Sequence, residues 1–288
     1  MKRITGLMLG TCLIAGCAGV AAQGQSEATM PPKVLSVTRE WTKPGKNGMS
    51  HEKTESVFVQ AMTQAKWPTH YLAVESVSGK PRALFFTPYD SFEAWEKDVK
   101  ATEKNAALMA ALDRANAADG ELLSAIDQSV LMFREDLSLR PKVDIPHTRY
   151  FGILRFHVKQ GHDKDWEALS KMYQSGFEKI PEAHWATYQV QYGLEAGTYI
   201  LFIPMKSAAE IDREANDWMK FTSAMGEDGM KKIADLIAAT VDSSEANLFV
   251  FNPRMSYVSE DWIKADPDFW KPKPAAAAAK PTKKPAAQ

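Results

Sequence analysis

The chain repeats one sequence pattern, and this duplication limits the available folds more than any other feature. Residues 37–45, VTREWTKPG, match residues 153–161, ILRFHVKQG, at an offset of 116. The apolar runs at 84–88 and 200–204 keep the same offset. Repetition at a constant spacing indicates that each copy is one structural unit. We therefore expect two similar domains in tandem.

Each copy has the order strand, helix, strand, strand, helix, strand. Apolar residues at helical spacing follow the first strand, and a glycine-containing turn separates two apolar runs that form a hairpin. We expect the second helix to be interrupted near Gly120 in one copy and near Gly226 in the other. This order is the ferredoxin-like βαββαβ unit. We predict an α+β protein with repeats at residues 33–138 and 148–256.

Helices cover one face of a ferredoxin-like sheet and leave the other open. Trp41, Tyr71 and Trp185 share that face with few charges, so we expect the two sheets to pack against each other. The element order and hydrophobic pattern of residues 34–255 resemble the dimeric α+β barrel superfamily, with the fused repeats replacing two subunits. NIPSNAP-like proteins and antibiotic-biosynthesis monooxygenases are the most similar members. The resemblance implies an intramolecular barrel with a cavity between its sheets.

Side-chain alternation selects residues for that cavity. Arg39 and Trp41 share one face of a strand, and Arg155 and His157 occupy the equivalent face in the second copy. Two interpretations stay open: an arginine paired with Glu75 for structural reasons, or arginines that bind an anionic ligand. The predicted ligand-binding residues are Arg39, Trp41, Tyr71, Glu75, Arg155, His157, Trp185 and Gln189.

The histidines do not form a recognisable metal-binding motif. No His-x-His, His-x-x-x-His or His-Glu-x-x-His spacing occurs, so we predict no metal site. The repeated pair His70 and His184 is expected to bond turn carbonyls. The haem-binding groups of the superfamily use an axial histidine, and that resemblance implies haem bound through His157, the mid-strand histidine of the predicted cavity. No catalytic motif identifies a reaction, so catalytic residues are unknown.

The N-terminal residues resemble a bacterial export signal. Lys2 and Arg3 precede a short apolar run and small residues, which is typical of a signal peptide over residues 1–22. A lipoprotein signal over residues 1–16, with lipidated Cys17, is the alternative. The protein is therefore expected in the periplasm or cell envelope, where a lipidated Cys17 would attach it to a membrane, in particular the outer membrane. Both cysteines lie in this leader, so the mature protein has no disulfide.

Charge distribution separates the ends of the chain from its centre. Removing the seven basic residues of the two ends from the total of 35 leaves 28 bases against 36 acids in residues 23–270. An acidic body excludes a nucleic-acid partner, which needs a basic face. The lysine-, proline- and alanine-rich tail at 271–288 is expected to be disordered, and we weigh attachment to an anionic envelope surface against no role.

The aromatic segment at 257–270 follows the last predicted strand. Its three large aromatic side chains, Trp262, Phe269 and Trp270, are expected either to pack over the barrel mouth or to dock a partner. The function predicted from the whole sequence is binding of a small apolar or anionic molecule between the sheets. The alternatives are a haem-dependent or cofactor-independent oxygenase-like enzyme and a structural envelope protein without a ligand.

Overall fold

The computed structural model describes residues 28–271 of the chain. The predicted signal peptide, its alternative lipidation site Cys17, and the basic tail after residue 271 lie outside the described residues. In the part that is described, no helix is long and apolar enough to cross a membrane.

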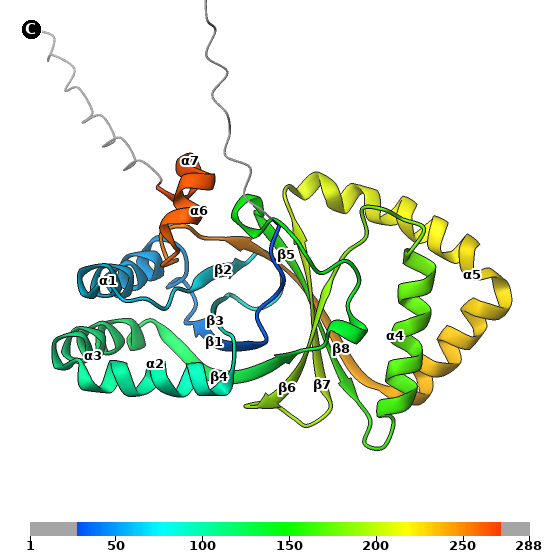
Figure 1. The fold of residues 1–288 in the computed structure, drawn as a ribbon, viewed down its shortest axis with the longest axis horizontal. Helices are drawn as coiled ribbons and strands as arrows, with labels where there is room; N and C mark the ends of the chain where they lie inside the picture. Colours follow the sequence, from blue (N-terminus) through cyan, green and yellow to red (C-terminus); the bar gives the residue numbers. More distant parts are fainter. Residues whose placement is uncertain (1–27, 272–288) are drawn as a thin grey trace, which may run out of the picture.

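Each half of the chain has the predicted order of strands and helices (Figure 1). The first half contains β1 (Val34–Thr42), α1 (Met49–Ala65), β2 (Leu72–Ser76), β3 (Arg82–Tyr89), α2 (Phe92–Lys104), α3 (Ala106–Gly120) and β4 (Leu123–Phe133). The second half contains β5 (Tyr150–Val158), α4 (Asp163–Phe177), β6 (Ala186–Tyr192), β7 (Thr198–Met205), α5 (Ile211–Thr240) and β8 (Val241–Phe251). Two short helices follow, α6 (Glu260–Ala265) and α7 (Pro267–Trp270).

The eight strands form one closed barrel in the order β1-β3-β2-β8-β5-β7-β6-β4. Within it the first half keeps the order β4-β1-β3-β2 and the second half the equivalent order β8-β5-β7-β6. Antiparallel pairs close both seams: Val74 lies opposite Phe251 between β2 and β8, and Leu131 lies opposite Val190 between β4 and β6. Closure pairs every sheet edge within the chain. The predicted α+β fold, an intramolecular barrel of two ferredoxin-like repeats, is confirmed.

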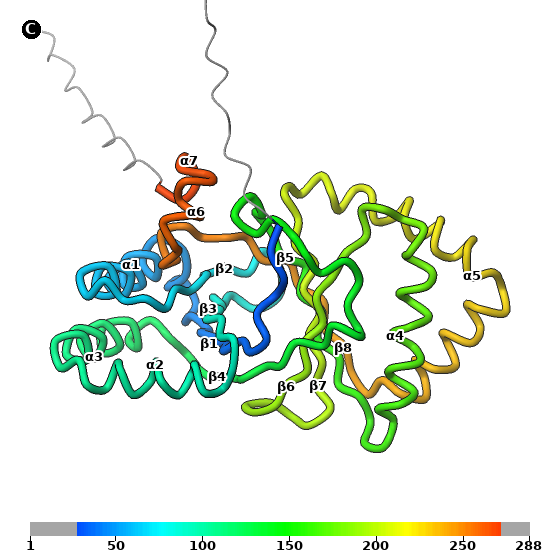
Figure 2. Tube along the Cα trace, in the orientation of Figure 1, coloured from blue at the N-terminus to red at the C-terminus, as the bar shows by residue number. Residues whose placement is uncertain are grey.

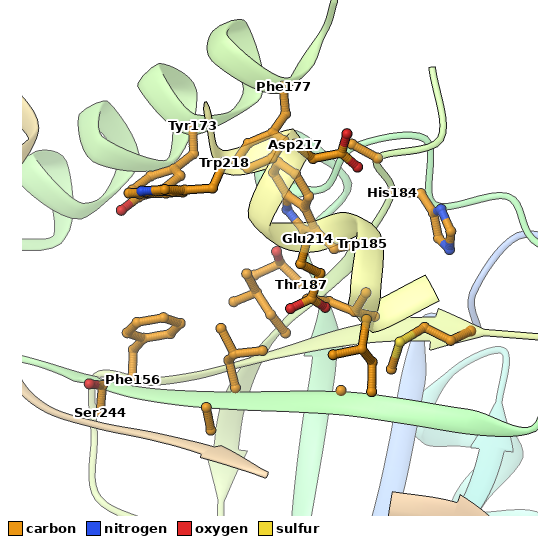
Figure 3. Close-up of a pocket in the computed structure, with 18 of the residues that line it drawn as sticks. Phe156, Tyr173, Phe177, His184, Trp185, Thr187, Glu214, Asp217, Trp218 and Ser244 are labelled. Atoms are coloured by element: carbon orange, nitrogen blue, oxygen red, sulfur yellow. The ribbon is translucent and has the colours of Figure 1, made fainter. Parts of the chain in front are cut away.

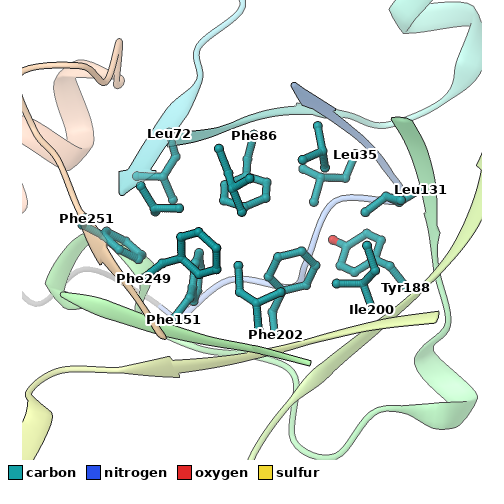
Figure 4. Close-up of a cluster of buried hydrophobic side chains, with 14 of the residues drawn as sticks. Leu35, Leu72, Phe86, Leu131, Phe151, Tyr188, Ile200, Phe202, Phe249 and Phe251 are labelled. Carbon is teal, nitrogen blue, oxygen red and sulfur yellow. The ribbon is translucent and has the colours of Figure 1, made fainter. Parts of the chain in front are cut away.

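Apolar side chains fill the interior of the barrel (Figure 4). Phe86 from one half contacts Phe202 from the other, with ring centroids 5.4 Å apart, and Phe151 contacts Phe251 at 4.7 Å. These side chains come from both sheets and occupy the space between them. Close packing of this kind leaves a core rather than a binding chamber. The centre of the barrel is therefore a packed core, and the expected cavity between the sheets is reduced to a smaller space at one end of the barrel.

The helices lie outside the barrel, with α1, α2 and α3 on the first half and α4 and α5 on the second (Figure 2). The predicted interruption of the last long helix is present at Gly226, whose φ of 65° breaks α5. In the first half the interruption was predicted wrongly at Gly120, which ends α3. The break falls at Asn105, because its side chain accepts a hydrogen bond from Leu108 N and starts a new helix.

The aromatic C-terminal segment packs against the barrel. Trp270 is 4% exposed and donates a hydrogen bond from Nε1 to Pro146 O at 2.9 Å. Trp262 and Phe269 pack on the same apolar core. Of the two alternatives for this segment, packing over the barrel and docking of a partner, the structure shows packing.

The β4–β6 seam depends on a glycine. Gly193 has a φ of 91°, and a Cβ there would lie 2.1 Å from Gln128 O and 2.7 Å from Ser129 Cα. We expect Gly193→Ala to lower the free energy of unfolding by about 3 kcal/mol, because it adds a clash with backbone to the cost of a positive φ. Urea denaturation measures this loss.

Gly45→Ala is the matched control, since Gly45 also has a positive φ, 76°, but a Cβ there meets nothing within 4 Å. Its expected cost is about 1 kcal/mol. Equal losses for the two variants would show that the seam does not require glycine.

Candidate functional site

The eight residues predicted to line one cavity lie in three separate places. The first group lies on the strand faces that carry the apolar residues of the barrel core, as predicted for β1 and β5. It consists of Arg39, Trp41, Arg155 and His157. The remaining four do not join them.

Tyr71 and Glu75 lie on the face of β2 that the first-half helices cover. Leu72 and Val74 belong to the barrel core, so alternation turns their neighbours outward, and Tyr71 packs with Ala73 in a separate cluster. Glu75 accepts a hydrogen bond from Asn252 Nδ2 at 2.7 Å. The prediction that Glu75 pairs with an arginine is therefore wrong.

Trp185 and Gln189 lie on the outer face of the second half, for the same reason. Tyr188 and Val190 occupy the barrel core, which places Gln189 outside, where Arg134 donates to its Oε1 at 3.1 Å. Trp185 packs against Phe177 of α4, with ring centroids 5.9 Å apart. The eight predicted residues thus do not converge on one cavity.

The arginines at the end of the barrel already have acidic partners. Arg39 forms an ion pair with Asp127 on β4, directly opposite in the strand register, and donates to Ser129 Oγ at 3.1 Å. Arg155 repeats this arrangement with Glu245 on β8, where Nη2 lies 3.4 Å from Oε2. Both copies therefore carry a cross-strand arginine–carboxylate pair, a structural role for these arginines.

His157 does not offer a free nitrogen to a haem iron. Its Nδ1 lies 3.2 Å from Asp242 Oδ2, and its Nε2 lies 3.2 Å from Ala196 O. An axial ligand needs one ring nitrogen available to the metal. The residues at this position do not fit the haem that the resemblance implied.

The repeated histidines hold carbonyl groups, as predicted. His184 places Nδ1 2.7 Å from Glu182 O and Nε2 2.7 Å from Pro204 O. His70 has a hydrogen bond with the backbone of Pro68, and burial lowers the pKa of its imidazole.

A cavity of about 1040 Å³ lies outside the barrel, between the second-half sheet and α4 and α5 (Figure 3). Tyr173 and Phe177 of α4 lie opposite Phe156 and Ser244 of the sheet, and Trp218 of α5 completes the wall. Aliphatic side chains from β5, β7 and β8 form the floor. Its size and apolar walls are those of a small-molecule site.

Aromatic packing between α4 and α5 holds this wall in place. Phe221 is fully buried and stacks on Phe177 at 4.6 Å and on Trp218 at 5.0 Å. Gly176 permits the approach, since a Cβ there would lie 2.3 Å from the Phe221 ring. The two helices are thus joined to each other, and Trp218 stays 44% exposed beside the cavity.

The polar groups of the cavity are mainly acidic. Glu182, Glu210, Glu214 and Asp217 contribute to its lining. Arg213 is paired with Glu210 at 3.3 Å, and Asp217 is paired with Lys220 at 2.9 Å. Burial, and then the neighbouring Asp217, raise the pKa of the Glu214 carboxyl. Such a lining disfavours an anion.

One hydrogen-bond donor of the lining is unused within the described residues. Trp166 is 4% exposed, and its Nε1 is buried without a hydrogen-bond partner there. An unmade buried hydrogen bond costs about 1–3 kcal/mol, and because this nitrogen is closed off from the cavity, that cost falls on the fold.

A second cavity of about 430 Å³ lies at one end of the barrel. It brings together two of the predicted residues, Tyr71 and Trp185, with Trp262 of the C-terminal segment. Core residues of both sheets, Phe86 and Phe202 among them, also line it, so it is the open end of the space between the sheets. Both predicted residues reach it from positions directly before β2 and β6.

The residues of the large cavity were missed at the sequence level. Tryptophans and methionines along the helices fit an ordinary apolar core, which hides a cavity wall. The available signal is the aromatic series Tyr173, Phe177 and Trp218 on two helices, together with a second-copy helix of 30 residues.

Comparison with known proteins adds distant structural neighbours. No family model matches the chain, and no curated protein is similar in sequence. A monooxygenase-like protein from Fusobacterium nucleatum is 12% identical, with 77% of this chain and 93% of that chain covered and a TM-score of 0.49. An anthrone oxidase-like protein is 18% identical, with coverages of 76% and 92% and a TM-score of 0.47.

Chlorite dismutase from Candidatus Nitrospira defluvii is 9% identical, with 78% of this chain and 92% of that chain covered and a TM-score of 0.43. All three similarities are low in identity and in TM-score, so no property of these neighbours is carried over to this chain. The NIPSNAP-like resemblance stays a prediction.

The Arg39–Asp127 pair predicts a measurable loss of stability. We expect Asp127→Ala to lower the free energy of unfolding by about 1.5 kcal/mol, because it leaves the buried guanidinium of Arg39 without its carboxylate. Glu93→Ala is the control, since Glu93 pairs with Lys97 in solvent and should cost less than about 0.5 kcal/mol. Equal effects in thermal denaturation would contradict a structural role for the barrel pair.

Proposed function

We propose that this protein binds a small, largely apolar molecule in the cavity between the second-half sheet and helices α4 and α5. The observation that carries the proposal is the cavity of about 1040 Å³ with aromatic and aliphatic walls. Burial of apolar ligand surface there supplies the affinity, at about 25 cal/mol per Å² before the costs of association are subtracted.

The polar groups of the lining define the remaining chemistry of the ligand. The carboxyl groups of Glu182 and Glu214 favour a neutral or positively charged polar end. The proposed ligand is therefore apolar and neutral or cationic, and the anionic alternative from the sequence is not retained.

Binding is favoured over an oxygenase-like reaction by the groups that line the cavity. His184, an imidazole of the lining, already has both ring nitrogens at carbonyl oxygens. The acids lie at the helix side of an apolar space, where they suit recognition of a polar end. We also propose that this binding takes place in the bacterial cell envelope, which rests on the N-terminal signal pattern alone.

A substitution that fills the cavity tests the proposal. Ala215 and Asn216 are adjacent exposed residues of α5, and only Ala215 lines the cavity. We expect the neutral dye Nile red to bind the purified protein with enhanced fluorescence. Ala215→Trp should weaken that binding at least about tenfold, equal to about 1.4 kcal/mol, because the indole occupies ligand volume.

Asn216→Trp is the matched control, since it adds the same side chain to the adjacent position, and it should bind the dye like the unsubstituted protein. Equal affinity in both variants would place the dye elsewhere and contradict the proposal. Circular dichroism of each variant checks that the fold is retained.

A further inference from the structure

A buried cluster of four titratable residues lies in the first half, away from the large cavity. Glu40 comes from β1, His51 and Glu55 come from α1, and Asp119 comes from α3. Their exposed fractions are 7%, 1%, 3% and 2%, so all four are buried between the sheet and the helices.

The four side chains converge on one point. One ligand atom from each residue lies within 4.8 Å of those of the others. His51 Nε2 is 3.0 Å from Glu40 Oε2, 3.6 Å from Asp119 Oδ1 and 3.9 Å from Glu55 Oε1. Three carboxylates and a single imidazole cannot balance their charges among themselves.

Two buried polar atoms beside the cluster lack hydrogen-bond partners within the described residues, which is an observation independent of the charges. Glu55 Oε1 is buried and has no hydrogen-bond partner within the described residues, although it faces this cluster. The hydroxyl of Tyr71 is also buried without such a partner, and it lies within electrostatic reach of Glu55 and Glu40. Buried polar atoms are normally satisfied, so these two indicate a missing partner.

The second half provides an internal comparison. Glu40 lies opposite Ala83 and Ile126 in the first half, and Phe156 takes the equivalent register position opposite Tyr199 and Ser244 in the second. There Phe156 packs on Trp166 of α4 with ring centroids 5.1 Å apart.

The same layer of the fold can therefore be filled by apolar contacts. The first half instead places three acids and a histidine in it, although buried acids are costly.

We propose that Glu40, His51, Glu55 and Asp119 together bind one divalent transition-metal cation. Three carboxylate oxygens and one imidazole nitrogen are ligands that suit Mn²⁺, Fe²⁺ and Zn²⁺. Thr54 donates a hydrogen bond to Asp119 Oδ1, which orients that carboxylate. The cation joins β1, α1 and α3, so its role is to fasten two helices to the sheet of the first half.

Histidine spacing in the sequence does not mark this site, because the site contains one histidine and the recognised metal-binding motifs contain two. His51 and Glu55 are four residues apart and share one face of α1, which is the available local signal. Glu40 and Asp119 are distant in the chain and reach the cluster only in the folded protein.

The test uses the mature protein, stripped of metal with a chelator and refolded with Mn²⁺ or Zn²⁺ alone, so that entry to a buried site is not limiting. We expect one ion per chain by elemental mass spectrometry and a rise in Tm of about 5 °C or more at saturating metal. Glu55→Gln should bind Mn²⁺ at least about 100-fold more weakly while the metal-free variant stays folded, because it keeps the shape and removes the charge.

Glu52→Gln is the matched control on the same helix, since Glu52 pairs with Arg254 outside the cluster, and it should bind metal normally. Asp119→Asn provides a second cluster variant if Glu55→Gln does not fold. Absence of a bound ion and of a Tm shift in the unsubstituted protein would overturn the proposal. A shift that persists in both cluster variants, or that is lost equally in Glu52→Gln, would also overturn it.

Discussion

Pairing of the sheet edges within a single chain is the constraint on which the rest of this structure depends. A ferredoxin-like sheet alone leaves two edge strands with unpaired backbone groups and one open apolar face. Here β2 pairs with β8 and β4 pairs with β6, so each repeat closes both edges of the other. The same closure encloses the open faces, which become the barrel core. Pairing of the edge strands therefore both completes the backbone hydrogen bonds of the sheet and buries its apolar face.

Closure also decides where ligands can bind. The barrel centre is filled by apolar residues from both halves, with Phe86, Phe151 and Phe202 in mutual contact. The larger binding space consequently lies in the layers between the sheet and the helices, and only a smaller cavity stays open at one end of the barrel. These layers differ between the repeats, because the second contains a large aromatic-walled cavity and the first a compact polar cluster. The two halves therefore share one framework of strands and differ in the side chains of their helix layers.

Predictions that used only the geometry of one strand placed the candidate residues correctly, and predictions that combined several strands did not. Alternation along one strand correctly placed Arg39 with Trp41 and Arg155 with His157, because that pattern has a fixed period of two. The prediction that Tyr71 and Glu75 face the same space was wrong. Alternation along β2 leaves open which of its two faces enters the core, and Leu72 and Val74 do so. The partner of Arg39 could not be predicted for the same reason. Asp127 lies 88 residues from Arg39 in the sequence and becomes its partner only through strand register.

The sequence by itself determined the repeated βαββαβ order, because constant offsets and hydrophobic periodicity are local properties of the chain. It also determined that the two copies should combine through apolar surfaces. Only the tertiary structure decided that the barrel interior is packed, that the large cavity lies against α4 and α5, and that Glu40, His51, Glu55 and Asp119 meet. Those features depend on side-chain volume and on contacts between residues far apart in the chain, and neither is encoded in the spacing of a motif.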